Sequence, residues 1–225
     1  MCIKPNMKII VFDTETTGLP KSRKASPQQS ELWPYIVQFS WLVYDDATKE
    51  IKSIKDYIIK LPDGMTIPED STKIHGITNE KMLAEGKPIH DILKEFIKDY
   101  LNSQIVVAHN IEFDSKVIQA ELYRNNMVNW IEKSCNIEYC TMKYGKPLTN
   151  ILRPSKFNNG TYQKPPKLME LHQYLFQTVP NNLHNSMIDV WVCFRCFHQM
   201  LFAEDILYTR EDTELENHFN ELCGL

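Results

Sequence analysis

The sequence predicts an α/β domain with a five-stranded mixed sheet, one strand of it antiparallel, and helices on both faces. Two observations predict this class. Short apolar runs rich in β-branched residues alternate with longer segments whose apolar residues recur every three or four positions, the periods of buried strands and amphipathic helices. The chain has 225 residues, 43% hydrophobic and 24% charged, the composition of an ordinary globular protein. We therefore expect a single domain over residues 1–225, with its core between about residues 7 and 203.

The first half of the chain predicts three strands. Met7 to Phe12 is a short buried strand, and 36–44 and 51–60 are the next two. Asp45 to Thr48 forms a turn between the second and third strands, which makes them an antiparallel hairpin. The polar stretch at 18–34 is a loop that leads into this hairpin.

The middle of the chain predicts a helix, a strand, a second helix and a final strand. Pro88 opens a segment in which apolar residues follow the helical period as far as residue 101. A short buried strand follows at 105–107, and Asn110 caps the next helix. We expect the fifth strand at 137–142.

The last third of the chain predicts a long loop and two helices. Residues 144–166 contain four prolines and two glycines without a clear period, which is typical of a loop or an insertion. The helical period returns at 168–177 and at 185–202. Cys193 and Cys196 form an isolated CxxC in the second of these helices, and we expect them to pack in the core because no second ligand pair accompanies them.

Charge is distributed unevenly along the chain, whose formal net charge is -4. Residues 141–167 carry six basic side chains and no acidic one, whereas residues 204–221 carry seven acidic side chains and one Arg. The basic residues are Lys143, Lys146, Arg153, Lys156, Lys164 and Lys167. This segment, expected at about 143–167, is either a solvated surface insertion or a contact for nucleic-acid phosphates, with Tyr144, Phe157 or Tyr162 stacking on bases.

The expected cellular setting follows from what the sequence lacks. No stretch approaches the roughly 18 apolar residues that a membrane helix needs, and the first residues show no secretory signal. We expect an intracellular, non-secreted protein, cytoplasmic or nuclear, that makes no membrane contact and whose six cysteines are reduced. In such a protein Asn159-Gly160-Thr161 is interpreted as a turn.

Five polar residues form a candidate active site. Asp13 and Glu15 are two positions apart at the end of a buried strand, so their carboxylates project the same way and offer the oxygen ligands that Mg2+ or Mn2+ prefers. Asp114 lies on the first turn of a helix that follows a strand. His184 and Asp189 accompany the last long helix, and Asp189 is directed inward because Cys193 lies four residues later on the same face.

These residues stand in three segments that resemble, in order, the motifs of the DEDDh exonucleases. The segments are Phe-Asp13-Thr-Glu15-Thr-Thr-Gly, His-Asn110-x-x-Phe-Asp114 and His184-x4-Asp189. That family belongs to the ribonuclease H-like superfamily and includes the proofreading subunit of bacterial replicative polymerases. Residues 73–78 match a fourth segment, and the resemblance runs from about residue 7 to about residue 200. The tyrosine subclass would carry Tyr at position 185, where this chain has Asn.

The resemblance implies a ribonuclease H-like fold and a two-metal hydrolysis of phosphodiester bonds. It implies that Asp13, Glu15 and Asp189 hold the Mg2+ or Mn2+ ion that carries the attacking water, and that Asp13 and, through water, Asp114 support the second. His184 would be the general base, because histidine titrates near neutral pH. The residues implied to contact the terminal nucleotide are Thr14, Thr16, Leu19 as a wedge, Ile77, Asn110 and Phe113.

We therefore expect a metal-dependent 3'-5' exonuclease that releases nucleoside 5'-monophosphates from single-stranded or frayed 3' ends, DNA being favoured over RNA. An oligoribonuclease-like enzyme acting on RNA shares every one of these residues and stays open. A catalytically silent nucleic-acid-binding or scaffold protein of this fold is the alternative of another class. A polymerase or repair partner is a further expectation, and the oligomeric state stays open. Ser186 departs from the family, which usually has Ala there.

Overall fold

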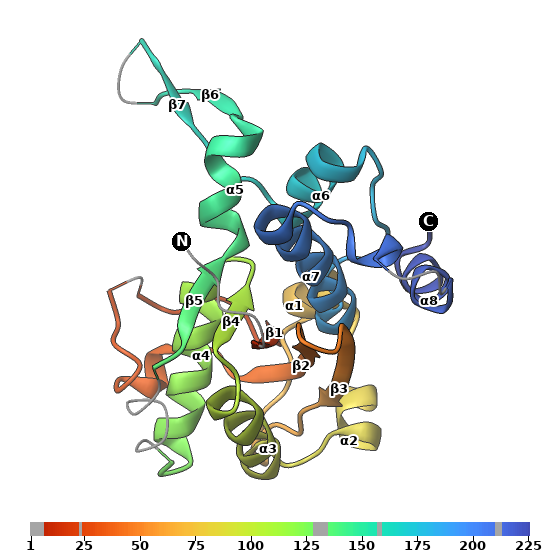
Figure 1. The fold of residues 1–225 in the computed structure, drawn as a ribbon. Coiled ribbons are helices and arrows are strands. Elements are labelled where there is room, and N and C mark those ends of the chain that lie inside the picture. The colour runs from red at the N-terminus through yellow and green to blue at the C-terminus, as the bar shows by residue number, and fades with distance from the viewer. Residues whose placement is uncertain (1–6, 23, 128–134, 157–158, 210–212) are drawn as a thin grey trace.

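The computed structural model describes residues 7–22, 24–127, 135–156, 159–209 and 213–225 (Figure 1). Its main sheet has five strands in the order β3-β2-β1-β4-β5. The strands are β1 (Lys8–Thr16), β2 (Ile36–Asp45), β3 (Glu50–Ile58), β4 (Ile105–Ala108) and β5 (Ile137–Cys140). β2 runs antiparallel to β1 and β3, and β4 runs parallel to β1 and β5. The predicted mixed sheet with one antiparallel strand is confirmed.

Helices cover both faces of the sheet. Successive side chains of β1 point to opposite faces, so the strand contributes apolar residues to the core on each side. Ile10 and Phe12 pack against α3 (Ile89–Leu101) and α4 (Ile111–Arg124). Ile9 and Val11 pack against the other helical layer. That layer consists of α6 (Leu168–Phe176), α7 (Ser186–Phe202) and α8 (Glu214–Cys223).

The α7 layer settles two expectations about the end of the chain. Cys193 and Cys196 are fully buried in its core, so the prediction that the CxxC packs internally is confirmed. α8 was not predicted, since its acidic composition hid its apolar stripe. Its Phe219 and Cys223 are buried in the same core, which therefore continues beyond residue 203.

Two short helices were also not predicted, α1 (Glu69–His75) and α2 (Asn79–Glu85). Each has seven residues, which is too short for a helical period to stand out. α2 begins after Thr78, whose side chain accepts the Lys81 N–H.

The predictions for residues 137–166 were wrong in two respects. The fifth strand ends at Cys140 rather than 142, because α5 (Thr141–Thr149) begins there. The expected loop contains this helix and a two-stranded hairpin, β6 (Leu152–Pro154) and β7 (Thr161–Gln163). With three residues a strand, the hairpin is too short to show alternation. We call residues 141–167 the arm, since its hairpin projects from the body of the molecule (Figure 1).

The connection between β6 and β7 includes the predicted turn. The Ser155 N–H donates to Gly160 O at 2.8 Å, and Thr161 begins β7. Phe157, one of the aromatic residues proposed to stack on bases, lies outside the described residues. Within the described part of the chain, no helix has the length and apolar character required to cross a bilayer.

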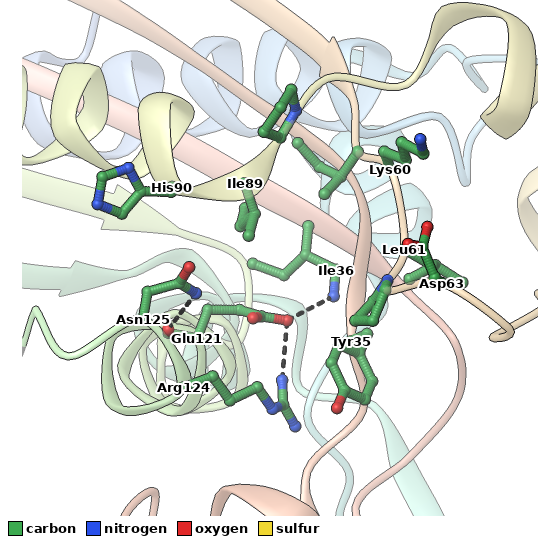
Figure 2. Close-up of a pocket in the computed structure, with 13 residues that line it drawn as sticks. Tyr35, Ile36, Lys60, Leu61, Asp63, Ile89, His90, Glu121, Arg124 and Asn125 are labelled. Carbon is green, nitrogen blue, oxygen red and sulfur yellow. Dashed lines mark hydrogen bonds and ion pairs between the residues drawn. The ribbon is translucent and has the colours of Figure 1, made fainter.

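A buried ion pair fastens the start of β2 to α4 beside a cavity of about 640 Å³ (Figure 2). Glu121 is 2% exposed, and its carboxylate accepts the Ile36 N–H at 3.2 Å and Arg124 Nη1 at 2.8 Å. The Arg124 guanidinium also stacks on Tyr35, 3.9 Å from the ring centroid. The negative charge of Glu121 is thus matched by a neighbouring cation, which is the arrangement of a structural pair.

Replacing Glu121 with Ala should lower the free energy of unfolding by about 3 kcal/mol, because it leaves the Arg124 charge unpaired and the Ile36 N–H without its acceptor. Urea denaturation measures this change. Glu112→Ala on the same helix is the control, since Glu112 is exposed and pairs with Lys116 at the surface; it should stay within about 0.5 kcal/mol of the unaltered chain. Equal effects of the two variants would contradict the structural role.

Candidate active site

The first two carboxylates lie in the last four residues of β1. The strand continues to Thr16, so Asp13 and Glu15 are paired opposite Ser40 and Gln38 of β2 rather than following the strand. Burial raises the pKa of Asp13 to about 7. Burial, then the charges of Asp13 and Asp114, raise the pKa of Glu15 to about 8. Both groups are therefore held where their negative charge is poorly solvated.

The beginning of α7 is fixed to β1 and β2 by hydrogen bonds. Ser186 Oγ donates to the Asp13 backbone O at 2.6 Å, and the Ser186 N–H donates to Gln38 Oε1 at 3.1 Å. Asn185 caps the helix, because its Oδ1 accepts the N–H groups of the second and third helical residues. Sequence reasoning treated Ser186 only as a small residue. The signal it passed over was a hydroxyl directly after a helix cap, where it can reach a neighbouring strand.

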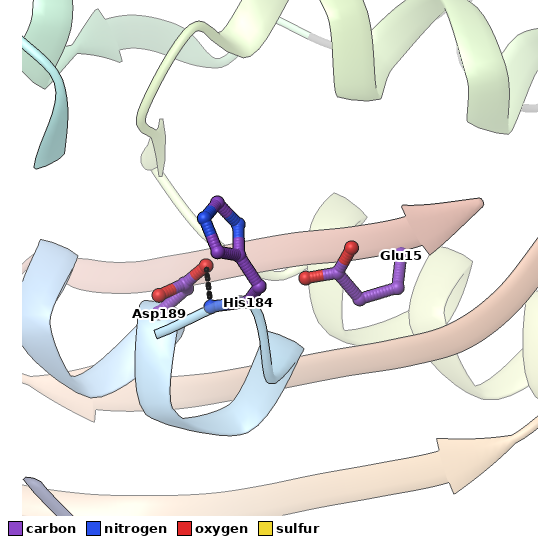
Figure 3. A group of neighbouring side chains, drawn as sticks. All are labelled: Glu15, His184 and Asp189. Carbon is purple, nitrogen blue, oxygen red and sulfur yellow. Dashed lines mark hydrogen bonds between the residues drawn. The ribbon is translucent and has the colours of Figure 1, made fainter. Parts of the chain in front are cut away.

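This docking brings the third carboxylate to β1. Ligand atoms of Glu15, His184 and Asp189 all lie within 4.8 Å of one another, and Figure 3 shows the three side chains turned toward a common space. The His184 backbone N–H donates to Asp189 Oδ2 at 3.3 Å, and the imidazole is exposed. Asp189 Oδ1 is buried and has no hydrogen-bond partner among the described residues. An unpartnered carboxylate oxygen in such a place suits a cation.

The fourth carboxylate comes from α4. Asp114 is 3% exposed, and its Oδ1 accepts both the Thr14 N–H at 3.1 Å and the Thr14 hydroxyl at 2.8 Å. Burial and the charge of Asp13 hold the pKa of Asp114 well above its usual range. The Thr14 hydroxyl, expected to contact substrate, is thus engaged by a carboxylate a hundred residues later in the chain.

Two further residues expected to contact substrate follow the cluster at the end of β1. Leu19 is 81% exposed, as a side chain that meets a ligand from solution would be. The Thr16 hydroxyl donates to Gly18 O at 2.7 Å and so shapes the turn before Leu19. Gly18 has φ +143°, a conformation that L side chains rarely adopt.

The other three expected substrate contacts are placed differently. Asn110 and Phe113 are half-buried at the start of α4, next to Asp114. Ile77 is 2% exposed and packs in a small apolar cluster with Val37. The structure thus sets the Ile77 side chain back from solvent.

One histidine that we did not single out lies beside the site. His75 is buried at the end of α1, and its Nδ1 accepts the Ile77 N–H at 3.1 Å. Burial and, less strongly, the charge of His184 lower its pKa, while a hydrogen bond with the Thr16 backbone opposes the shift. Its position inside the fourth matching segment, 73–78, was the signal that could have identified it.

The four carboxylates of the site differ from the ion pairs elsewhere in the fold because no cationic side chain of the described residues balances their charge. We call Asp13, Glu15, Asp114 and Asp189 the carboxylate cluster. No Lys or Arg among the described residues forms an ion pair with any of the four. Burial raises the pKa of each of the four, and the charges of neighbouring carboxylates raise those of Glu15, Asp114 and Asp189 further. The donor set therefore fits divalent cations, which would supply the missing positive charge.

A family model described as RNase_T, exonuclease, matches residues 10–197 and so spans the sheet and the whole cluster. The chain belongs to the RNase_T exonuclease family. It is a nuclease of the DEDDh type within the ribonuclease H-like superfamily, as the ordered motifs indicated. Its exonuclease core is the five-stranded sheet with helices on both faces.

Its relatives include epsilon subunits of DNA polymerase III. The chain is 26% identical over 216 residues to DNA polymerase III subunit epsilon of Buchnera aphidicola subsp. Acyrthosiphon pisum (strain APS), covering 96% of this chain and 81% of that protein. It is 29% identical over 125 residues to the epsilon subunit of Haemophilus influenzae (strain ATCC 51907 / DSM 11121 / KW20 / Rd), covering 56% of this chain and 44% of that protein.

Among solved structures, E. coli exonuclease I in complex with a dT13 oligonucleotide shares the fold, with a TM-score of 0.62 and 16% identity. The likeness covers 96% of this chain and 44% of exonuclease I. The exonuclease thus corresponds to less than half of that larger protein.

The raised carboxylate pKa values predict a metal- and pH-dependent stability. Without metal, the four carboxyls of the cluster bind more protons in the folded chain than in the unfolded chain, so their contribution to stability falls as pH rises from about 4 to about 8. Mg2+ or Mn2+ requires the deprotonated cluster, so the gain in thermal midpoint on adding either ion should be larger at pH 8 than at pH 6. At a hundred times its dissociation constant, the ion should add about 2.7 kcal/mol.

Asp13→Asn tests the cause of this gain. At pH 8 in EDTA it should be at least as stable as the unaltered chain, because it removes one repelling charge, and it should lose most of the metal-dependent rise. Asp63→Asn, at an exposed carboxylate outside the cluster, is the matched control and should keep the full rise. Differential scanning calorimetry or fluorimetry measures both. A full metal response in Asp13→Asn would rule out the cluster as the cation site.

Proposed function

We propose that this exonuclease is a metal-dependent 3'-5' enzyme that releases nucleoside 5'-monophosphates from single-stranded or frayed 3' ends of DNA. The observation that carries the proposal is the meeting of Glu15, His184 and Asp189 beside two more buried carboxylates, with no cation of the described chain to balance them. DNA is favoured because the relatives include polymerase III epsilon subunits and an exonuclease I bound to dT13.

Each carboxylate has a separate part in the proposed site. Asp13, Glu15 and Asp189 would hold one divalent cation, and Asp13 would share the second with Asp114. Thr14 fixes one oxygen of Asp114 in place, so that carboxylate is orientated before any ion arrives. Two bound cations would stabilise negative charge on the attacked phosphate and on the departing 3'-oxygen.

His184 is proposed to take a proton from the attacking water. Its backbone N–H is held by Asp189, while no described residue hydrogen-bonds to its exposed ring. The ring is therefore free to meet a water molecule beside the cluster. A positioned histidine of this kind contributes a factor of about 10² to 10⁴ to a rate.

The last nucleotide is proposed to lie against the exposed Leu19 and the half-buried Asn110 and Phe113. Leu19 would pack on the face of the terminal base, since it is a large apolar side chain that no part of the described fold covers. Thr16 would support Leu19 through the turn that it stabilises at Gly18. Ile77 is buried and would not contact the nucleotide directly.

The activity is tested with 5'-labelled DNA and RNA oligomers of matched sequence, single- and double-stranded, incubated with Mg2+ or Mn2+. A ladder that shortens from the 3' end, with nucleoside 5'-monophosphates as products, is expected for single-stranded DNA and should vanish in EDTA. Faster cleavage of RNA would assign the oligoribonuclease-like activity instead. No cleavage of any substrate under these conditions would favour a silent binding protein.

Substitutions in the cluster connect this activity to the site. Asp13→Ala and Asp189→Ala should abolish hydrolysis, because each removes a ligand of the proposed cations, and His184→Ala should lower kcat about 10²-fold or more. Asp63→Ala is the control and should retain full activity. Hydrolysis that persists in Asp189→Ala, or in EDTA, would contradict the proposed mechanism.

A further inference from the structure

A groove of about 610 Å³ runs along the base of the arm. Its lining includes Asn110, at the start of the helix that carries Asp114, and the acidic residues Glu112 and Glu138. Its walls include Lys116 from α4 and Lys143 and Lys146 from α5. Lys116 is paired with Glu112, whereas no described acidic residue forms an ion pair with Lys143 or Lys146. The groove therefore joins the proposed site to two uncompensated cations.

Aromatic side chains accompany these cations. Tyr144 lines the groove with its ring half exposed, and it stacks on Tyr139 with centroids 4.4 Å apart, which holds its orientation. On the hairpin, Arg153 is paired directly opposite Tyr162 across the two strands, so both side chains leave the same face. Both are exposed.

The remaining basic residues of the arm divide into free and structural ones. Lys164 pairs with Glu170 of α6 at 2.7 Å and so ties the arm to the body. Arg153 and Lys156 are exposed, and no described acidic residue forms an ion pair with either. Lys167 is also exposed, but it caps α6 and its backbone N–H donates to Glu170 at 2.7 Å. Arg153 thus lies on the hairpin that projects from the body (Figure 1).

One histidine attaches both ends of the arm to the site. His109 Nε2 lies 3.1 Å from Pro166 O, and a carbonyl can only accept, so this nitrogen carries the hydrogen. Nδ1 then accepts the Thr141 hydroxyl at 2.9 Å. His109 directly precedes Asn110, so the base of the arm is held in a fixed relation to the proposed pocket.

We propose that the groove and the arm bind the part of a single nucleic-acid strand that lies on the 5' side of the cleaved nucleotide, with phosphates on Lys143, Lys146 and Arg153 and bases on Tyr144 and Tyr162. Cations that track a backbone beside aromatic rings on which bases stack are the means by which proteins bind single strands. An acidic protein segment would match the positive charge of the arm. It would not account for the pairing of Arg153 with Tyr162, or for the position of the groove beside the proposed nucleotide pocket at Asn110. The proposal rests on the proposed exonuclease function and gives it a preference for longer strands.

The test compares Lys143→Glu/Lys146→Glu and Arg153→Glu/Tyr162→Ala with the unaltered chain. Lys81→Glu/Lys98→Glu is the control for the first pair, because it makes the same charge change at exposed positions outside the arm. The ratio of kcat/KM for a single-stranded 20-mer to that for a trinucleotide should fall at least tenfold in both arm variants and stay within about twofold of the original in the control. All substituted positions lie on the surface apart from the half-buried Lys146, so thermal midpoints should change little, and they verify folding.

Binding supplies an independent measurement. Fluorescence anisotropy of a labelled 20-mer in EDTA, without turnover, should show the same loss of affinity. The slope of log affinity against log salt should fall by about 0.7 for each lost phosphate contact. An unchanged length ratio and salt slope in both arm variants, or an equal loss in the control, would overturn the proposal. If the unaltered chain cleaved no substrate at all, the exonuclease proposal would fail, and the anisotropy comparison would still decide whether the arm binds a strand.

Discussion

Four carboxylates are gathered around the end of one buried strand, and the fold supplies no cation to balance them within the described residues. Charges of one sign so close together in a poorly solvated place oppose folding, and burial raises their pKa values accordingly. Elsewhere the same chain compensates acids, as Arg124 does for the buried Glu121 and Arg195 for the half-buried Asp205. The carboxylate cluster has no such cation among the described residues. Stability is given up there for a site that can take up divalent cations.

The cluster keeps its shape through neutral contacts that leave carboxylate oxygens available. Ser186 donates to the backbone O of Asp13, and Thr14 occupies one oxygen of Asp114. The His184 N–H bonds to one oxygen of Asp189, whose other oxygen has no partner among the described residues. Hydroxyl and amide donors orientate a carboxylate without neutralising its charge. A lysine or arginine in the same positions would orientate it equally well, but it would also satisfy the charge that a metal ion needs.

The features of the site that could be predicted from the sequence are those that local sequence patterns determine. Strand and helix periods, and the order of three motifs, predicted the sheet and brought Asp13, Asp114 and Asp189 to one edge, because parallel strands end together. The bond between Thr14 and Asp114 spans a hundred residues and depends on the exact approach of α4 to β1, which no local pattern encodes. Ile77 was expected at the substrate, although the same residue also fits the apolar cluster in which it is buried. α5 and the hairpin were missed because proline and glycine in short elements resemble a loop.

The arm shows why local charge matters more than the total. A chain of net charge -4 with a buried acidic cluster repels a polyanion at long range, and that repulsion is greatest at the place where a phosphodiester would have to arrive. Residues 141–167 carry six basic and no acidic side chains, and His109, the residue before Asn110, holds both ends of this segment. Lys164 pairs with Glu170 of α6, so the proposed phosphate contacts would fall to the unpaired basic residues. A strand held by these cations approaches the carboxylates already in line with the groove, and divalent cations at the cluster would remove the remaining repulsion where the two meet.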